Sequence, residues 1–121
     1  MRKLIYIIGV MLLLASCGQQ HQAKSIIKDF IDRNISESSA RGSISIVRFD
    51  STKVLADSII LRMRTNADTT KRYQKPIKYD EGEACKKFFT VRIKYTINDT
   101  EYSETHYLDD QLSRVVAFKT N

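Results

Sequence analysis

The ten residues from Phe88 to Ile97, FFTVRIKYTI, constrain the fold of this chain more than any other stretch. From Phe89 onward, apolar and polar side chains alternate, and successive side chains of a β-strand point to opposite faces of the sheet. The apolar face would carry Phe89, Val91, Ile93, Tyr95 and Ile97. The pattern predicts an antiparallel strand with one buried face and one face in water.

Two further segments follow this strand after short turns, and they predict a three-stranded meander. Turn-forming residues occupy Asn98–Thr100 and Asp109–Gln111. The segments Glu101–Leu108 and Leu112–Lys119 are predicted as the second and third strands, because turn signals separate them and apolar residues recur within them.

An earlier strand is predicted over Ser43–Asp50, where β-branched residues dominate. The alternation changes phase at Ile46–Val47, which indicates a β-bulge or a strand covered on both faces. A turn is expected at Asp50–Thr52. The following segment, Lys53–Thr65, fits either a short helix or a strand, and its density of β-branched residues favours a strand over Asp57–Arg64.

Upstream of these strands, Ala23–Ile35 has the spacing of an amphipathic helix. Its apolar stripe consists of Ile26, Ile27, Phe30 and Ile31. A polar connector, Ser36–Gly42, follows the helix. Packing the stripe on the Phe89–Ile97 face would bury both, so the predicted fold class is α+β, with one N-terminal helix on a curved antiparallel sheet of about four to five strands.

The predicted hairpin places ionisable side chains on the apolar face of the sheet. A two-residue turn at Asp99–Thr100 would pair Tyr95 with Glu104, and His106 would lie two residues further along the same face. A carboxylate and an imidazole covered by a helix could act as acid, base or ligand contact. They could equally be inward and merely paired with each other, and a slip of one residue would turn both to solvent.

The segment Asn66–Lys87 is long and poorly patterned, with basic residues interleaved with tyrosines. Loops of this length in small domains are often functional, so Lys71, Arg72 and Tyr73 are candidate contacts for an anionic partner. The alternative is a solvated loop without a binding role.

The chain begins with a segment of a different kind. Arg2 and Lys3 precede an uncharged apolar run, Leu4–Leu14, and two small residues then lead to Cys17. At ~1.5 Å per residue this run covers roughly half of a ~30 Å hydrocarbon core. A charged start, a short apolar core and small residues at the end are typical of a secretory signal peptide.

The last four residues of that segment, Leu14-Ala15-Ser16-Cys17, resemble the lipobox of bacterial lipoproteins. The resemblance implies a diacylglyceryl group on the Cys17 sulfur, cleavage before Cys17 and acylation of the new amino group, which would anchor the protein to a membrane. The alternative is an ordinary signal peptide with a chance cysteine.

The resemblance also implies a domain organisation and a location. Residues 1–16 would be the signal peptide, residues 17–22 a lipidated tether and residues 23–121 a single α+β domain. Gly18 is not the aspartate typical of inner-membrane retention, and no acidic run follows it. The expected location is the periplasmic face of the outer membrane of a Gram-negative cell.

Charge and cysteine content restrict which binding partners and which disulfides the chain can have. Cleavage would remove two of the 20 Lys and Arg residues, leaving 18 against 14 acidic residues and a formal charge of +4. This mild, diffuse charge favours anionic lipid or glycan over nucleic acid. If Cys17 is a thioether, Cys85 has no disulfide partner in the chain, so it is either a small buried hydrophobe or a reactive or intermolecular thiol.

No motif for a nucleotide, a metal or a nucleophile appears in the sequence, so no cofactor, metal or catalytic residue is expected. The spacing of Asp80, Glu81 and Glu83 misses the EF-hand pattern. In element order alone, Ala23–Lys119 resembles the small cystatin-like or NTF2-like periplasmic lipoproteins of the Bacteroidota type.

The sequence therefore favours a non-enzymatic, lipid-anchored envelope module that binds a protein, an envelope glycan or a small ligand. One alternative is a small catalytic or ligand-binding roll that uses Tyr95, Glu104 and His106. Another is an inhibitor or immunity-type lipoprotein that presents the loop Asn66–Lys87 to a protein partner.

Overall fold

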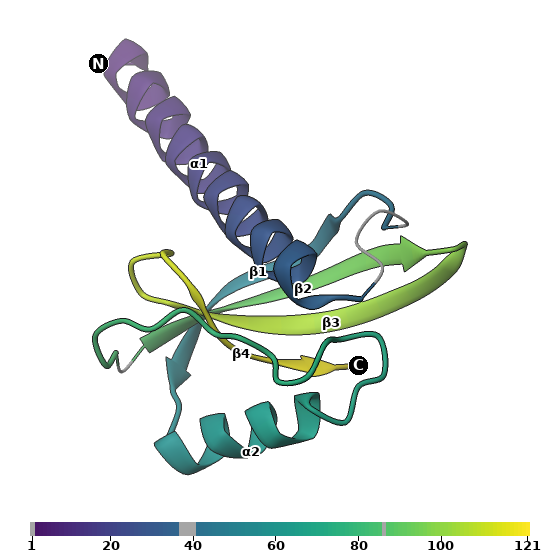
Figure 1. Ribbon diagram of the computed structural model, residues 1–121. Coiled ribbons are helices and arrows are strands. Elements are labelled where there is room, and N and C mark those ends of the chain that lie inside the picture. Colours follow the sequence, from purple (N-terminus) through teal and green to yellow (C-terminus); the bar gives the residue numbers. More distant parts are fainter. Residues whose placement is uncertain (1, 37–40, 86) are drawn as a thin grey trace.

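The computed structural model describes residues 2–36, 41–85 and 87–121. The described elements follow the order α1 (Arg2–Asn34), β1 (Ser45–Val54), α2 (Asp57–Ala67), β2 (Lys87–Ile97), β3 (Thr100–Asp109) and β4 (Val115–Thr120) (Figure 1). The predicted α+β class is confirmed. Within the predicted connector Ser36–Gly42, residues 37–40 lie outside the described part of the chain.

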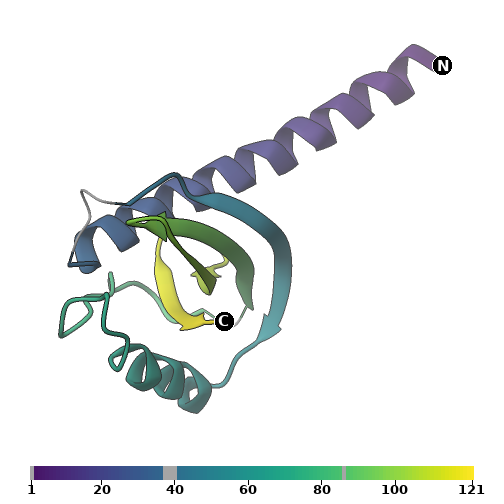
Figure 2. The same cartoon turned by 90° about the vertical axis from the view of Figure 1, so that its right-hand side faces the viewer.

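The four strands form one antiparallel sheet in the order β1-β2-β3-β4. The sheet curves, and α1 lies across one of its faces (Figure 2). The predicted meander is thus confirmed for β2, β3 and β4. The predicted bulge is confirmed as well, because Ile46 pairs with Ile93 and Arg48 with Arg92, which leaves Val47 as the extra residue.

The helix α1 begins well before the predicted Ala23. Residues 18–22, expected as a tether, continue the helix with exposed side chains. Among the side chains described from Gly18 on, burial begins at Ala23 and recurs at Ile27, Phe30 and Ile31, which are at most 1% exposed. This spacing of three and four residues places the stripe on one side of the helix, where it packs on the sheet.

The core lies between α1 and the curved face of the sheet. Its strand contribution includes Val91, Ile93, Tyr95, Leu108 and Phe118, all at most 2% exposed. The ring of Phe30 on α1 meets the ring of Phe118 on β4 edge to face, with centroids 5.7 Å apart. Such geometry lets two large rings fill the same layer without voids.

The strand predicted over Asp57–Arg64 is wrong, because this segment forms the helix α2. Asp57 lies in the first turn and Arg64 in the last, where each charge complements the helix dipole. Ile59 and Leu61 suggested a strand, but they stay 44% and 66% exposed. β-Propensity reflects packing on a half-buried pleated surface, and no such surface is offered here.

The turn predicted at Asp50–Thr52 is also wrong. β1 continues to Val54, and its pairing with β2 runs through Ser51 opposite Phe89 to Val54 opposite Lys87. A register shift between Ser51 and Val54 absorbs the polar residues that suggested a turn. The first strand therefore pairs along most of the length of β2, from Lys94 to Lys87.

Candidate functional site

The β2–β3 hairpin determines where the candidate site residues lie. Its turn is Asn98–Asp99, with φ of 50° and 67°, and not the predicted Asp99–Thr100. Tyr95 pairs with Tyr102, and Ile93 pairs with Glu104. The predicted register was wrong by two residues, and because side chains alternate with a period of two, every side chain of β3 keeps its predicted face.

Glu104 and His106 accordingly point into the core, and both are 0% exposed. The hydroxyl of Tyr73 donates to the Glu104 carboxylate, 2.6 Å from Oε1 and 2.8 Å from Oε2. The hydroxyl of Tyr95 donates to Oε2 at 2.6 Å. His106 Nε2 lies 2.9 Å from Oε1. We call these four residues, together with Arg72, the Glu104 cluster: Arg72, Tyr73, Tyr95, Glu104 and His106.

Arg72 closes the cluster from the loop that follows α2. Its Nη2 lies 2.5 Å from Glu104 Oε2, and its Nε donates to the Tyr95 hydroxyl at 2.9 Å. The guanidinium also lies over the ring of Tyr102, 4.2 Å from the centroid. Arg72 thus pairs with the buried carboxylate on one side and packs on the partly exposed Tyr102 ring on the other.

His106 is fixed by rings as well as by the carboxylate. Its ring stacks on Phe118 at 5.1 Å between centroids and meets the edge of Phe30 at 5.9 Å. Its Nδ1 is buried without a hydrogen-bond partner among the described residues. An ionised carboxylate can only accept, so the proton shared with Glu104 resides on Nε2 of His106.

The hydrogen bonds decide the charge state of Glu104. Burial alone would raise the pKa of Glu104, but the hydrogen bond and charge of His106 and the hydroxyls of Tyr73 and Tyr95 lower it to about 2. Burial and the neighbouring carboxylate raise the pKa of Tyr73 and of Tyr95 well above the usual tyrosine range. At neutral pH Glu104 is therefore an ionised carboxylate that accepts hydrogen bonds from the hydroxyls of Tyr73 and Tyr95.

This arrangement favours a structural role over acid–base chemistry. Both oxygens of Glu104 are occupied, and no face of the carboxylate or of the His106 ring meets solvent. A general acid or base has to reach a substrate proton at hydrogen-bonding distance. What the cluster does instead is tie the loop after α2, through Arg72 and Tyr73, to β2 and β3.

The loop itself is pinned to α1 and is not a fully solvated segment. Tyr73 and Ile77 are 2% and 7% exposed. The backbone amide of Gln74 donates to the Asn34 carbonyl at 2.6 Å. The Asn34 side chain donates to the Lys78 carbonyl and accepts from the Lys78 amide. Tyr73 pairs with Ile35 in an isolated bridge. The loop is thus exposed along much of its length, but Tyr73 and Ile77 anchor it to the core.

The remaining predicted site residues lie apart from the cluster. Lys71 is exposed and lines a shallow pocket of about 340 Å³ with Arg72 and Tyr102. Cys17 lies in α1, and its side chain is outside what the structure describes. No group of His, Cys, Asp and Glu side chains suited to a metal ion occurs among the described residues.

Two features of the site were missed by the sequence analysis. One is the ion pair between Arg72 and Glu104, which lie 32 residues apart in the sequence. The other is a pocket beside α2 that contains Arg64 and Arg114. The second was hidden because its helix was expected to be a strand.

Comparison of the chain with families of known proteins, with curated proteins and with solved structures finds no match. Within the part of the chain that the structure describes, no helix is long and apolar enough to cross a membrane.

Proposed function

We propose that this chain is a lipid-anchored protein of the Gram-negative envelope, held by a diacylglyceryl group on Cys17 at the periplasmic face of the outer membrane. Its folded body acts as a non-enzymatic binding module. The residues that motivate the anchor are the lipobox-like run Leu14-Ala15-Ser16-Cys17 and the charged and apolar segment before it.

One observation carries the proposal. Among the described residues, the first buried side chain is that of Ala23, and a hydrogen bond joins α1 to the loop before β4 from Gln22 Nε2 to the Leu112 carbonyl at 3.0 Å. In both views the N-terminal part of α1 extends away from the sheet (Figures 1 and 2). Cleavage before Cys17 would therefore leave the described core whole.

The short distance between the anchor and the body sets the geometry of the module. Residues 18–22 would span about 8 Å as a helix and about 17 Å when extended. The body is thus expected to stay close to the membrane surface. In both views α2 lies at the end of the body away from the N-terminus, so its surface would face the periplasm (Figures 1 and 2).

The Glu104 cluster supports binding over catalysis. Its ionisable groups satisfy one another inside the core, as expected of a network that stabilises a fold. The alternative of a catalytic roll would need Glu104 or His106 to meet a substrate, and both are fully buried. A surface away from this cluster is the better candidate for partner contact.

Metabolic labelling tests the anchor directly. Cells that express the full chain are grown with an alkyne fatty acid, and the purified wild type is compared with Cys17→Ser and with Cys85→Ser as the matched control. We expect label in the wild type and in Cys85→Ser, none in Cys17→Ser, and recovery of the labelled protein with the outer membrane. Equal labelling of all three, or a wild type that stays unlabelled in the soluble fraction, contradicts the proposal.

A further inference from the structure

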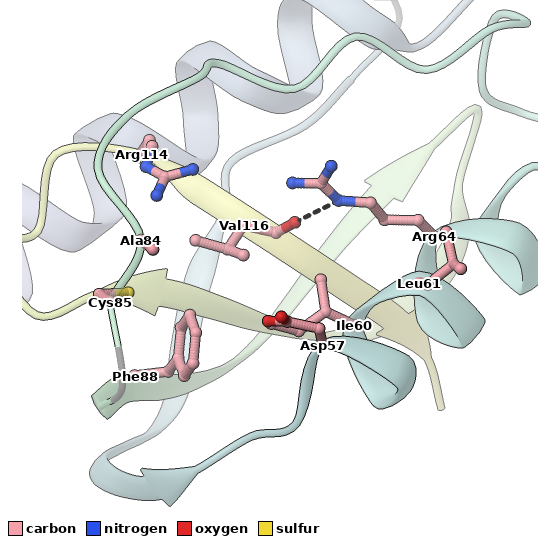
Figure 3. A pocket seen from close by; sticks show the side chains of 9 residues that line it. All are labelled: Asp57, Ile60, Leu61, Arg64, Ala84, Cys85, Phe88, Arg114 and Val116. Atoms are coloured by element: carbon pink, nitrogen blue, oxygen red, sulfur yellow. Dashed lines mark hydrogen bonds between the residues drawn. The ribbon is translucent and has the colours of Figure 1, made fainter.

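A pocket of about 380 Å³ lies between α2, the start of β2 and β4, on the surface that the proposed anchor leaves facing outward (Figure 3). This volume falls in the range of small-ligand sites, roughly 300–1,000 Å³. We call it the α2 pocket. It is lined by Asp57, Ile60, Leu61, Arg64, Ala84, Cys85, Phe88, Arg114 and Val116.

The α2 pocket holds two guanidinium groups that bond to backbone oxygens. Arg64 Nε donates to the carbonyl of Val116 at 2.8 Å. Arg114 donates to the carbonyls of Asp80 at 3.4 Å and Glu83 at 2.7 Å. Within the described ranges, neither arginine has a carboxylate within ion-pair distance. Both charges are positioned without being neutralised.

Two local features of the backbone hold the side chains of Arg64 and Arg114 in place. Val116 is the extra residue where Ala117 pairs with Tyr107 and Val115 pairs with Leu108, so its carbonyl is available to Arg64. A side chain at Gly82 would collide with the Arg114 guanidinium, so glycine there lets the loop lie against it.

The nearby acid Asp80 is not free to neutralise the pocket. Both of its carboxylate oxygens accept from Arg33 on α1, at 3.0 and 2.9 Å. The hydrogen bond from Arg33 lowers the pKa of Asp80, and the charge of Arg114 adds to the same effect. Asp80 is therefore already paired with a cation outside the α2 pocket.

Between its charged groups the pocket is apolar. Figure 3 shows the Asp57 carboxylate on one side and the two guanidinium groups on the other, with Val116 between them and with Phe88 and Ile60 flanking Asp57. Leu61 also lines the pocket and is 66% exposed. A ligand that covers this leucine would remove apolar surface from water.

We propose that the α2 pocket binds the C-terminal residue of a peptide partner whose last side chain is apolar. The terminal carboxylate would lie against Arg64 and Arg114, the side chain against Leu61 and Phe88, and a backbone N–H would donate to Asp57. The inference rests on the proposed function, because it names the partner class of the same anchored module.

The chemistry of the pocket distinguishes a peptide end from a fatty acid. Both carry a carboxylate and an apolar body, but only the peptide has an N–H donor beside its carboxylate. Asp57 would repel a bare carboxylate and attract a ligand that brings a donor. The single acid in the pocket therefore favours the peptide.

Binding is measured by calorimetry on the full lipidated chain in nanodiscs, with N-acetyl-alanyl-leucine as the probe. Its C-terminal amide and octanoate are the comparison ligands. We expect saturable binding of the acid and at least about tenfold weaker binding of the amide, since loss of a charge-assisted contact typically costs a factor of this order. Octanoate should also bind more weakly than the acid.

Variants place the binding in the pocket. Leu61→Ser should weaken binding of the acid several-fold, whereas Ile59→Ser, on the same helix but outside the pocket lining, should leave it unchanged. Asp57→Asn should weaken binding of the peptide and not that of octanoate. Because Leu61 and Ile59 are exposed, both variants are expected to fold, and thermal unfolding checks this.

Three outcomes overturn the inference: no saturable binding of the acid, equal binding of the acid and the amide, or equal loss in Leu61→Ser and Ile59→Ser. Tighter binding of octanoate than of the peptide would assign the pocket to a fatty acid instead. Each of these results leaves the acylation of Cys17 untouched, so failure here is separable from failure of the anchor.

Discussion

Replacing Glu104 by Gln tests the role of the buried cluster most sharply. The substitution keeps the shape of the side chain and removes its charge. The guanidinium of Arg72, whose side chain is 17% exposed, then loses its carboxylate partner. The new amide group also turns a donor toward the hydroxyls of Tyr73 and Tyr95, which are donors to Glu104 in the native protein.

The expected loss follows from the pKa of Glu104, which falls from an ordinary 4.5 to about 2 in the folded protein. A tenfold change in proton affinity corresponds to about 1.4 kcal/mol, so the ionised carboxylate contributes roughly 3 kcal/mol to folding. Removing one partner of a buried pair costs ~3–5 kcal/mol, which agrees in size. Small domains have only ~5–15 kcal/mol in total.

The direction of the pKa shift determines how the stability contributed by Glu104 changes with pH. Because folding lowers the pKa of Glu104, its contribution is complete above about pH 4.5 and is lost as the pH falls toward 2. We expect Glu104→Gln to be roughly 3 kcal/mol less stable than the wild type at pH 7. The difference should shrink steadily between pH 4.5 and pH 2, because the unfolded wild-type chain takes up a proton at Glu104 in this range while the folded carboxylate stays ionised.

The assay is urea unfolding followed by far-UV circular dichroism between pH 2 and pH 7, on a chain that begins at Gly18. Glu101→Gln is the matched control on the same strand, because the Glu101 side chain is 64% exposed and lies 3.5 Å from Lys94. It should change stability by less than ~0.5 kcal/mol. Equal stability of Glu104→Gln and wild type at pH 7, or a constant difference across the pH range, refutes the reasoning.

Three further predictions concern the frame around the cluster, and thermal unfolding checks each. Gly42→Ala places a methyl group against the hydroxyl of Thr96 and should cost ~1–3 kcal/mol, most of it recovered by adding Thr96→Ala; no recovery would contradict the steric cause. Asp99→Gly should stabilise by about 0.5 kcal/mol because φ is 67° there, and a loss would contradict this. Asn34→Ala should cost ~2–3 kcal/mol, because it leaves the amide of Lys78 unpaired; a neutral result would show that the loop is held elsewhere.

Much of the fold was predictable because its signal lies in local periodicity. The alternation from Val91 to Ile97 sets which side chains of β2 are buried, and the spacing of Ile27, Phe30 and Ile31 does the same for α1. The inward position of Glu104 survived a wrong register, since a two-residue error preserves the face. The local sequence pattern therefore predicts which face a side chain occupies more reliably than it predicts which residue pairs with it on the neighbouring strand.

The turn of the hairpin could have been predicted better. Asn98 and Asp99 both adopt positive φ, a conformation that Asn and Asp tolerate better than other non-glycine residues. That preference favours Asn98–Asp99 over Asp99–Thr100 as the two central residues. Weighing it would have given the observed pairing of Tyr95 with Tyr102.

The remaining features depend on contacts between distant segments. Arg72 reaches Glu104 only because the loop after α2 folds back against the end of α1. No local pattern in the sequence of this loop predicts where it packs. α2 was mistaken for a strand because Ile59 and Leu61 are apolar yet exposed. An exposed apolar residue misleads a periodicity argument, and at Leu61 it also marks the pocket proposed to bind a peptide end.

The most direct test of the account is the intact mass of the protein extracted from native membranes. We predict a chain that begins at Cys17 and carries the added mass of a diacylglyceryl group together with an amide-linked acyl chain. A chain that still begins with Met1, or one that begins at Cys17 with an unmodified thiol, would contradict the anchored module on which the proposals depend.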